Sequence, residues 1–351
     1  MRWAWALALL ALVVAGSAVP AAPGDRLAHF KELARRYADA PDPALDDPVL
    51  AELFAVVDDE VVENLRAGGL FASVAFVQER LEAFSDEWGG AAFKVAAPSG
   101  GTTDALMLGL FTLTRGEPRG SLRIYGRSDG TGSLIAAVTR EGSVEVQAWP
   151  NRHGTPQFLA SWLGPATGRR SRTLHLELWR QRAGGGAGRV WSSGDAFPEG
   201  LPAIDFAAKA GQILVRYEVH YPGWKPGCAG ETEQEDVYRQ SAGAPGLALV
   251  RRRVVNGWHR ELQSAVTRFF GALGADDRKA LAELVPDASL RARLPRELQA
   301  DAVCDERNPA APATVIVAAT REHAQQRVPW SLAWRRGPSG WRLAAATPVL
   351  Q

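Results

Sequence analysis

The spacing of apolar residues changes twice along the chain, and this limits the possible folds more than any other feature. Apolar residues recur every three to four positions from about 25 to 90, every second position from about 91 to 255, and again at helical spacing from about 257. A period near 3.6 is typical of amphipathic helices, and a period of 2 is typical of half-buried strands. We therefore expect an α+β protein with a helical segment at 23–90, a β-rich domain at 91–256 and an α+β domain at 257–351.

Turn and capping residues sharpen the helical part. Asp47 can cap a helix whose first turn holds Pro48, and Gly68-Gly69 can end it. A further helix with an apolar stripe at Val77, Leu81, Phe84 and Trp88 follows. We expect these two helices to form an N-terminal hairpin that packs on the β-rich domain.

The middle of the chain contains many short candidate strands separated by Gly, Pro, Asn and Ser. Their spacing favours antiparallel sheets and leaves a sandwich, a barrel or a partial propeller open. The expected strands are 92–97, 104–115, 120–127, 134–140, 143–149, 157–163, 172–181, 188–193, 204–209, 212–221 and 247–255.

The last third begins with helical patterns and ends with three expected strands at 313–320, 328–336 and 340–349. Its motifs are Ala265–Leu273, Asp277, Ala280–Val285, Trp330–Trp334 and Gly340–Leu343. They resemble the opening helix pair and the last two strands of the NTF2-like (SnoaL-like) family. The resemblance implies a curved sheet that helices close into a cone with a pocket. That family includes enzymes, binding modules and structural domains, so the resemblance implies no particular activity.

The N-terminus has the pattern of a secretory signal. Met1-Arg2 precedes an apolar run from Trp3 to Val19, and small residues follow it. We expect residues 1–22 to be a cleaved signal, with an uncleaved membrane anchor as the alternative. The prediction is a periplasmic or secreted protein with no membrane span after cleavage.

Cys228 and Cys304 are the only cysteines, and both lie among loop-forming residues. In an oxidising compartment two such thiols tend to form a disulfide, which we expect here. Without a nearby histidine pair they do not form a structural zinc site. We expect neither a metal nor a cofactor.

The charge balance is nearly neutral, since 40 Lys and Arg face 39 Asp and Glu among 351 residues. A nucleic-acid-binding protein usually has a basic surplus, so we expect no nucleic acid as a partner. An envelope protein or a glycan is the expected partner.

The most unusual stretch runs from Tyr221 to Asp236. Aromatic residues on Pro/Gly turns can stack on sugars or peptides, and the acidic run after them has oxygen ligands of the kind that calcium binds. The acid spacing is not that of an EF-hand, and a solvated acidic loop is the simpler interpretation. The predicted ligand-binding residues are Tyr221, Trp224, Glu231, Glu233, Glu235 and Asp236.

Two strands carry His/Glu pairs at alternate positions, His175 with Glu177 and Glu218 with His220. Such pairs can bind a metal or share a proton, but a solvent-facing strand edge is the favoured interpretation. The chain contains no His-Glu-x-x-His motif. We therefore expect a non-enzymatic binding or scaffolding module. The alternative is an envelope glycan or peptide hydrolase that uses Glu177 and Glu218.

Two further patterns bear on packing. Several tryptophans fall at strand spacing, which favours core or interface packing over an exposed glycan-binding row. The short basic runs at 169–172 and 251–253 are typical of exposed loop or edge-strand residues.

Overall fold

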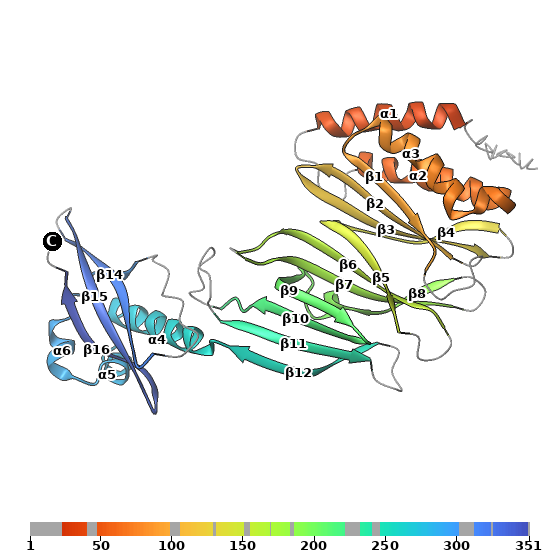
Figure 1. Cartoon of the computed structure of the whole chain (residues 1–351). Coiled ribbons are helices and arrows are strands. Elements are labelled where there is room, and N and C mark those ends of the chain that lie inside the picture. Colours follow the sequence, from red (N-terminus) through yellow and green to blue (C-terminus); the bar gives the residue numbers. More distant parts are fainter. Residues whose placement is uncertain are drawn as a thin grey trace, which may run out of the picture.

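The structure is a computed structural model that describes residues 23–40, 48–98, 106–128, 131–150, 155–168, 170–182, 186–221, 232–240, 246–301, 312–323 and 326–349. The predicted signal, both cysteines, Trp224 and Glu231 lie outside these residues. The α+β class is confirmed, because the described residues form helices and three antiparallel sheets (Figure 1). No helix in this part of the chain has the length and apolarity needed to cross a bilayer.

The α-helices form two groups along the described sequence, one before sheet A and one before sheet C. The first group is α1 (Pro23–Asp39), α2 (Pro48–Ala67) and α3 (Val74–Glu87), with the 3-10 turn η1 (Gly69–Ala72) between α2 and α3. The second group is α4 (Gly257–Gly274), α5 (Arg278–Leu284) and α6 (Ala288–Arg293). The predicted stop at Gly68-Gly69 is confirmed, because α2 ends at Ala67.

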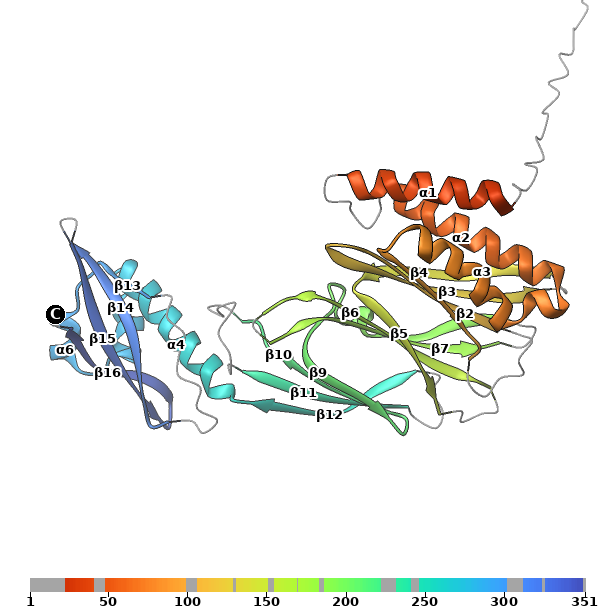
Figure 2. The ribbon, with the colours of Figure 1, turned by 45° about the horizontal axis from the view of Figure 1, so that its top comes forward.

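Sheet A is an antiparallel meander that the N-terminal helices cover on one face (Figure 2). Its strands are β1 (Ala91–Ala96), β2 (Leu106–Arg115), β3 (Glu117–Ser128) and β4 (Thr131–Glu141). On β2, Phe111 and Leu113 belong to the core shared with the helices, and Leu106 and Leu108 belong to the core shared with the next sheet. Sheet A is therefore the middle layer of three, which explains the nearly continuous burial of β2.

Sheet B is larger and packs under sheet A. Its strands are β5 (Ser143–Trp149), β6 (Gln157–Ala166), β7 (Arg172–Gln181), β8 (Ala187–Ser192), β9 (Leu201–Lys209), β10 (Gln212–Glu218), β11 (Glu233–Gln240) and β12 (Leu247–Val255), and the 3-10 turn η2 (Ser193–Asp195) follows β8. The order along the sheet is β12-β11-β10-β9-β7-β6-β5, with β8 beside β7. The Trp162 indole N–H of β6 donates to the Gly120 carbonyl of sheet A at 3.1 Å, which ties the two layers together.

The chain passes from sheet A to sheet B at Gly142. This residue has φ of 102°, and an added Cβ would lie 2.3 Å from the Leu163 carbonyl oxygen. Only glycine combines this backbone conformation with so close an approach, so Gly142 is required where the two sheets meet.

The C-terminal unit, residues 257–349 of the described chain, places α4–α6 against sheet C. That sheet has the order β13 (Leu298–Ala300), β14 (Thr314–His323), β15 (Gln326–Gly337) and β16 (Gly340–Pro348). Trp258, Phe269, Trp334 and Trp341 lie in one aromatic core between the helices and the sheet. The NTF2-like resemblance of this unit stays a prediction.

The main departure from the expected elements is β11. Its sequence, Glu-Gln-Glu-Asp-Val-Tyr-Arg-Gln, begins with the acidic run that favoured a solvated loop. Its burial alternates only in part, because carboxylates lie at positions that apolar residues would normally hold. The expected helix at 289–299 is likewise shorter, since α6 ends at Arg293 and β13 begins at Leu298.

Candidate functional site

The described acids of the predicted site, Glu233, Glu235 and Asp236, lie on β11, and their carboxylates already have partners. Glu233 pairs with Arg216 of β10, and Glu235 lies 2.9 Å from Arg251 and 3.7 Å from Arg253. These arginines belong to the strands on either side of β11. The acidic run and the basic run 251–253 are therefore cross-strand partners, a pairing that the sequence analysis missed.

Asp236 is the most enclosed of these carboxylates and is completely buried. Its two oxygens each accept a 2.9 Å hydrogen bond from Arg252, and the Tyr217 hydroxyl donates to it at 2.9 Å. Burial first and the nearby Asp236 charge second raise the pKa of Tyr238 to about 12. The cluster is a satisfied polar core beneath the sheet edge and offers no unpaired carboxylate to a ligand.

The rest of the predicted ligand-binding site is only partly described. Tyr221 is half-buried at the end of a described segment, whereas Trp224 and Glu231 lie outside the described residues. A cavity of about 370 Å³ lies beside this segment. Its lining includes Phe197, Tyr217 and His220, and Arg252, the partner of Asp236, also faces it.

The His175/Glu177 pair is not the solvent-facing edge that the sequence favoured. Glu177 is completely buried between the two sheets, where Arg140 lies at 2.8 Å and Arg189 at 3.1 Å. Burial first, and then the Arg140 charge, lower the pKa of His175 to about 4. The edge interpretation was wrong here because sheet A covers the face that would otherwise meet water.

The register of sheet B also separates the two carboxylates of the hydrolase alternative. Arg172 and Tyr217 are level, because both pair with Ala203. Glu177 lies five residues beyond Arg172, and Glu218 lies one residue beyond Tyr217 in the same direction. The difference of four residues is about 13 Å along the strands. A glycosidase pair needs roughly 5–10 Å, so these two side chains do not form one.

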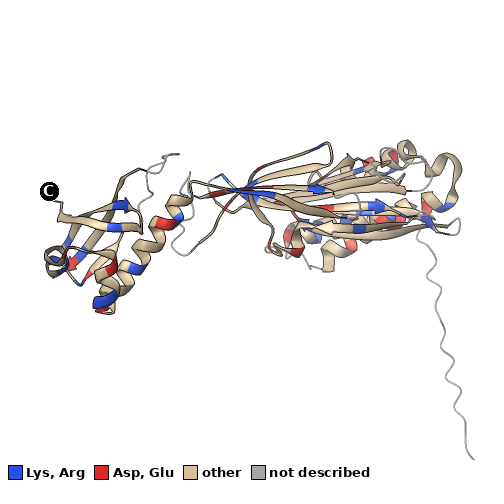
Figure 3. Cartoon of the chain, turned by 90° about the horizontal axis from the view of Figure 1, so that it is seen from below, with Lys and Arg blue, Asp and Glu red and all other residues tan. Residues whose placement is uncertain are grey.

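Of the tryptophans expected in the core, Trp149, Trp162 and Trp179 are buried, which confirms that interpretation for them. Figure 3 shows basic and acidic residues interspersed along the ribbon, in keeping with the balanced charge. Among the described residues no group of three or more His, Cys, Asp or Glu could hold a metal ion.

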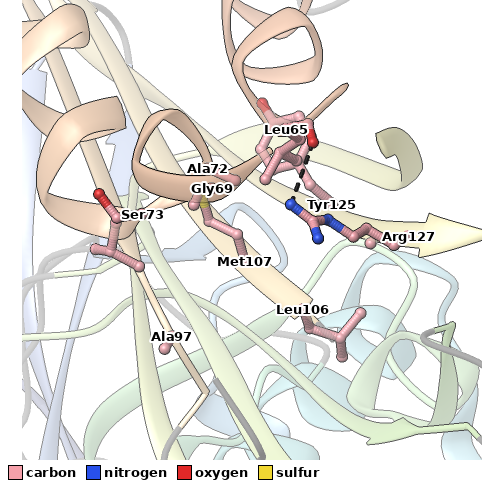
Figure 4. A pocket seen from close by; sticks show the side chains of 11 residues that line it. Leu65, Gly69, Ala72, Ser73, Ala97, Leu106, Met107, Tyr125 and Arg127 are labelled. Atoms are coloured by element: carbon pink, nitrogen blue, oxygen red, sulfur yellow. Dashed lines mark hydrogen bonds between the residues drawn. The ribbon is translucent and has the colours of Figure 1, made fainter. Parts of the chain in front are cut away.

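A larger cavity, of about 530 Å³, lies where the α2–α3 turn meets the ends of β1, β2 and β3 (Figure 4). We call it the α2–α3 cavity. Most of its lining is apolar. The lining residues are Leu65, Gly69, Ala72, Ser73, Val74, Ala97, Leu106, Met107, Tyr125, Gly126 and Arg127.

Local sequence positions the helical wall of this cavity. Gly68 and Gly69 have φ of 71° and 57°, a conformation that lets the chain leave α2 and turn at once into η1. The Ser73 hydroxyl then caps α3 by accepting from the Phe76 amide at 3.3 Å. The glycine turn and the Ser73 cap hold Ala72 and Val74 over the open ends of the strands.

A buried polar cluster around Tyr125 fixes the floor of the α2–α3 cavity. The Tyr125 hydroxyl donates to the Asp58 carboxylate at 2.6 Å, and Arg123 lies 3.6 Å from the same carboxylate. Burial raises the pKa of Asp58, although Arg123 and the Tyr125 hydrogen bond lower it. Burial and the Asp58 charge raise the pKa of Tyr125 well above its ordinary value. Tyr125 is therefore a neutral, fixed wall whose hydroxyl points into the protein.

Arg127 is the charged member of the lining. Its guanidinium donates from Nη2 to the Leu65 carbonyl oxygen at 3.3 Å, as the dashed line in Figure 4 shows. A guanidinium carries five N–H groups, so this bond leaves donors for a ligand. The cavity thus combines an apolar lining with one cation, while its hydroxyl groups serve the fold itself.

The α2–α3 cavity was not predicted from the sequence. Its lining comes from segments more than 60 residues apart, and most of them are ordinary core residues. The exposed Leu-Phe pair that follows Gly68-Gly69 was the one signal that could have indicated it. Comparisons with protein-family models and with curated proteins give no match. The geometry of this cavity is therefore the main guide to function.

Proposed function

We propose that this chain is an exported, non-enzymatic binding protein whose α2–α3 cavity holds the apolar chain of a small amphiphilic molecule. The observation that carries the proposal is the mostly apolar cavity of about 530 Å³, a size typical of small-molecule sites. The Ser73 and Tyr125 hydroxyls are engaged within the fold, so neither is poised as an acid, a base or a nucleophile.

The position of Arg127 gives the chemistry of the head group. Its guanidinium lies in the lining and donates to the Leu65 carbonyl oxygen, so a carboxylate or phosphate on the ligand would gain a charge-assisted hydrogen bond there. A glycan would instead leave its hydroxyl groups unpaired against Leu106, Met107 and Val74. The ligand class favoured by the lining is therefore an anion with a hydrocarbon tail.

The proposal includes the expected address and layout of the chain. Residues 1–22 are the proposed secretory signal, the α1–α3 layer with sheets A and B is the ligand-binding body, and an NTF2-like unit follows from residue 257. Cleavage of the signal would give a periplasmic or secreted protein. The chemistry of the cavity agrees with an envelope location, where amphiphiles are abundant.

Fluorescence titration with cis-parinaric acid, a fluorescent fatty acid, tests the proposal. We expect saturable binding of one probe molecule per chain. Saturated fatty acids from C8 to C14 should displace the probe with affinities that rise about fourfold per CH₂ until the cavity is full. Substitution Ala72→Trp places an indole in the cavity and should weaken binding at least tenfold.

Ala51→Trp is the matched control, because Ala51 is exposed near the other end of α2. It lies 16 residues before Ala67, or about 24 Å along the helix. The proposal fails if parinaric acid does not bind, or if both tryptophan variants bind it as the unsubstituted protein does.

A further inference from the structure

The α2–α3 turn exposes two large apolar side chains at its tip. Leu70 is 84% exposed and Phe71 is 50% exposed, and they are adjacent in η1. Their neighbours Gly69 and Ala72 line the α2–α3 cavity. The exposed pair therefore lies directly beside the cavity, on the same four-residue turn.

This exposure is built into the local backbone. The positive φ angles of Gly68 and Gly69 aim the turn away from the core, and Phe71 packs edge-on against Phe76 with ring centroids 5.1 Å apart. The hydroxyl of Ser73 closes the turn by donating to the Leu70 carbonyl at 2.7 Å. Because the turn is fixed on both sides, Leu70 and Phe71 stay exposed instead of packing onto the apolar wall of the cavity.

Cations flank this tip. The Arg66 Nε donates to the Gly132 carbonyl oxygen at 3.2 Å, and Arg127 donates to the Leu65 carbonyl oxygen. Both hydrogen bonds go to backbone oxygens, so both guanidinium groups keep their full positive charge. The nearby Glu63 carboxylate pairs with Arg26. The surface around the tip is thus apolar at its centre and basic at its edge.

The chain enters the helical layer at the same end. The ion pair between Arg26 near the start of α1 and Glu63 near the end of α2 places the first described residues beside the α2–α3 turn. The exposed tip, the cavity and the start of α1 therefore share one end of the molecule (Figure 2).

We infer that the Leu70–Phe71 tip docks onto an anionic lipid surface and places the α2–α3 cavity against the membrane that supplies its ligand. Exposed Leu and Phe side chains enter the boundary between head groups and acyl chains, and flanking cations attract anionic head groups. The charge complementarity with Arg66 and Arg127 favours a lipid surface over a neutral apolar partner. The supply of ligand rests on the proposed function, whereas docking of the tip can be measured separately.

Vesicle co-sedimentation of the exported protein tests docking, with the mature N-terminus identified by mass spectrometry. One set of vesicles is phosphatidylcholine alone. The other contains about 30% phosphatidylglycerol, so about one lipid in three is anionic. We expect the double variant Leu70→Ser/Phe71→Ser to lose at least tenfold in affinity for anionic vesicles. Substitution Arg66→Gln should lose about fivefold on anionic vesicles and little on neutral ones.

The matched control is Leu249→Ser/Val250→Ser on β12, where the two side chains are 42% and 53% exposed. It removes two exposed apolar side chains far from the tip in sequence and should bind vesicles normally. Parinaric acid titration accompanies every variant. Because Leu70 and Phe71 are not in the cavity lining, their double variant should still bind the probe from solution.

Three results would overturn the docking inference. They are the absence of vesicle binding by the unsubstituted protein, unchanged vesicle affinity in the Leu70/Phe71 variant, and equal losses in the tip and β12 variants. A tip variant that converts a dimer to a monomer, while vesicles remain unbound, would assign the tip to a contact between copies of the chain. None of these results changes the outcome of the parinaric acid titration, so failure of docking and failure of ligand binding are distinguishable.

Discussion

Two surfaces of this molecule combine arginines with exposed apolar side chains, and they differ in how those arginines are used. On the edge strand β12, Arg251 and Arg252 pair with the carboxylates of Glu235 and Asp236. At the α2–α3 turn, Arg66 and Arg127 donate to backbone carbonyl oxygens. The first surface has its charges neutralised by the fold, whereas the second retains them for an external partner.

The comparison teaches that an unusual sequence is a poor guide to a binding site. The acidic run at 231–236 stands out in the sequence, yet its described carboxylates form ion pairs with arginines of the neighbouring strands. The α2–α3 cavity is lined by common residues, and it exists because the fold leaves the ends of the strands uncovered. Satisfied polar groups stabilise the protein, and unsatisfied surfaces are available to ligands.

The largest expected effect is on the β11 cluster. Asp236→Ala would leave Arg252 and the Tyr217 hydroxyl without their buried acceptor and should lower the free energy of unfolding by about 3–4 kcal/mol. Parinaric acid binding at 25 °C should not change, provided the variant remains folded. Urea unfolding measures the loss. Glu235→Ala, whose arginine partners are exposed, is the control and should cost less than about 1 kcal/mol.

The next effect is a dependence of stability on pH, caused by His175 between sheets A and B. His175 has a folded pKa of about 4 against an ordinary value of 6.5, so the folded protein binds fewer protons than the unfolded chain between these values. Stability should therefore fall as the pH falls from 6.5 towards 4, by at most about 2.5 kcal/mol between pH 7 and 4.5. Urea titrations at the two pH values measure this difference. In His175→Gln the difference should shrink by that amount, and an unchanged difference would contradict the burial of a neutral imidazole.

A smaller effect on stability is expected at Tyr125, where stability and ligand affinity should respond differently. Tyr125→Phe removes the donor to Asp58 and should lower the free energy of unfolding by about 1–2 kcal/mol. Since the hydroxyl points to Asp58 and not into the cavity, parinaric acid affinity should stay within about twofold. Thermal unfolding and the fluorescence titration test the two parts. A large loss of affinity with normal stability would show that the hydroxyl faces the ligand.

The smallest effect concerns the head group. Arg127→Gln should weaken parinaric acid binding about fivefold, the equivalent of about 1 kcal/mol for one exposed charge-assisted hydrogen bond. The methyl ester of the same acid, which has no negative charge, should bind both proteins equally. Equal losses for acid and ester would assign Arg127 to the shape of the cavity instead of its charge.

Much of the fold could be predicted from the sequence, because local periodicity and turn residues determine most elements. The Gly68-Gly69 stop and nearly all strands followed from residues close together in the chain. The failures have a common physical cause. β11 and the environment of Glu177 depend on partners in other strands, and a sequence period does not reveal which face a second sheet covers.

The candidate site was less predictable than the fold. The α2–α3 cavity joins α2, η1 and the ends of three strands, so its existence depends on the tertiary packing of segments that are separate in sequence. By contrast, Tyr221, Trp224 and Glu231 remain a sequence-based hypothesis for a second ligand site.

Photolabelling tests the central claim most directly. A C12 fatty acid with a diazirine near its methyl end would be bound by the protein and irradiated, and the labelled peptides would be sequenced by mass spectrometry. The account predicts labels on Leu65, Val74 and Met107, with their loss when unlabelled fatty acid competes. Competable labelling concentrated instead at Phe197 and Tyr217, with none on the α2–α3 cavity, would contradict it.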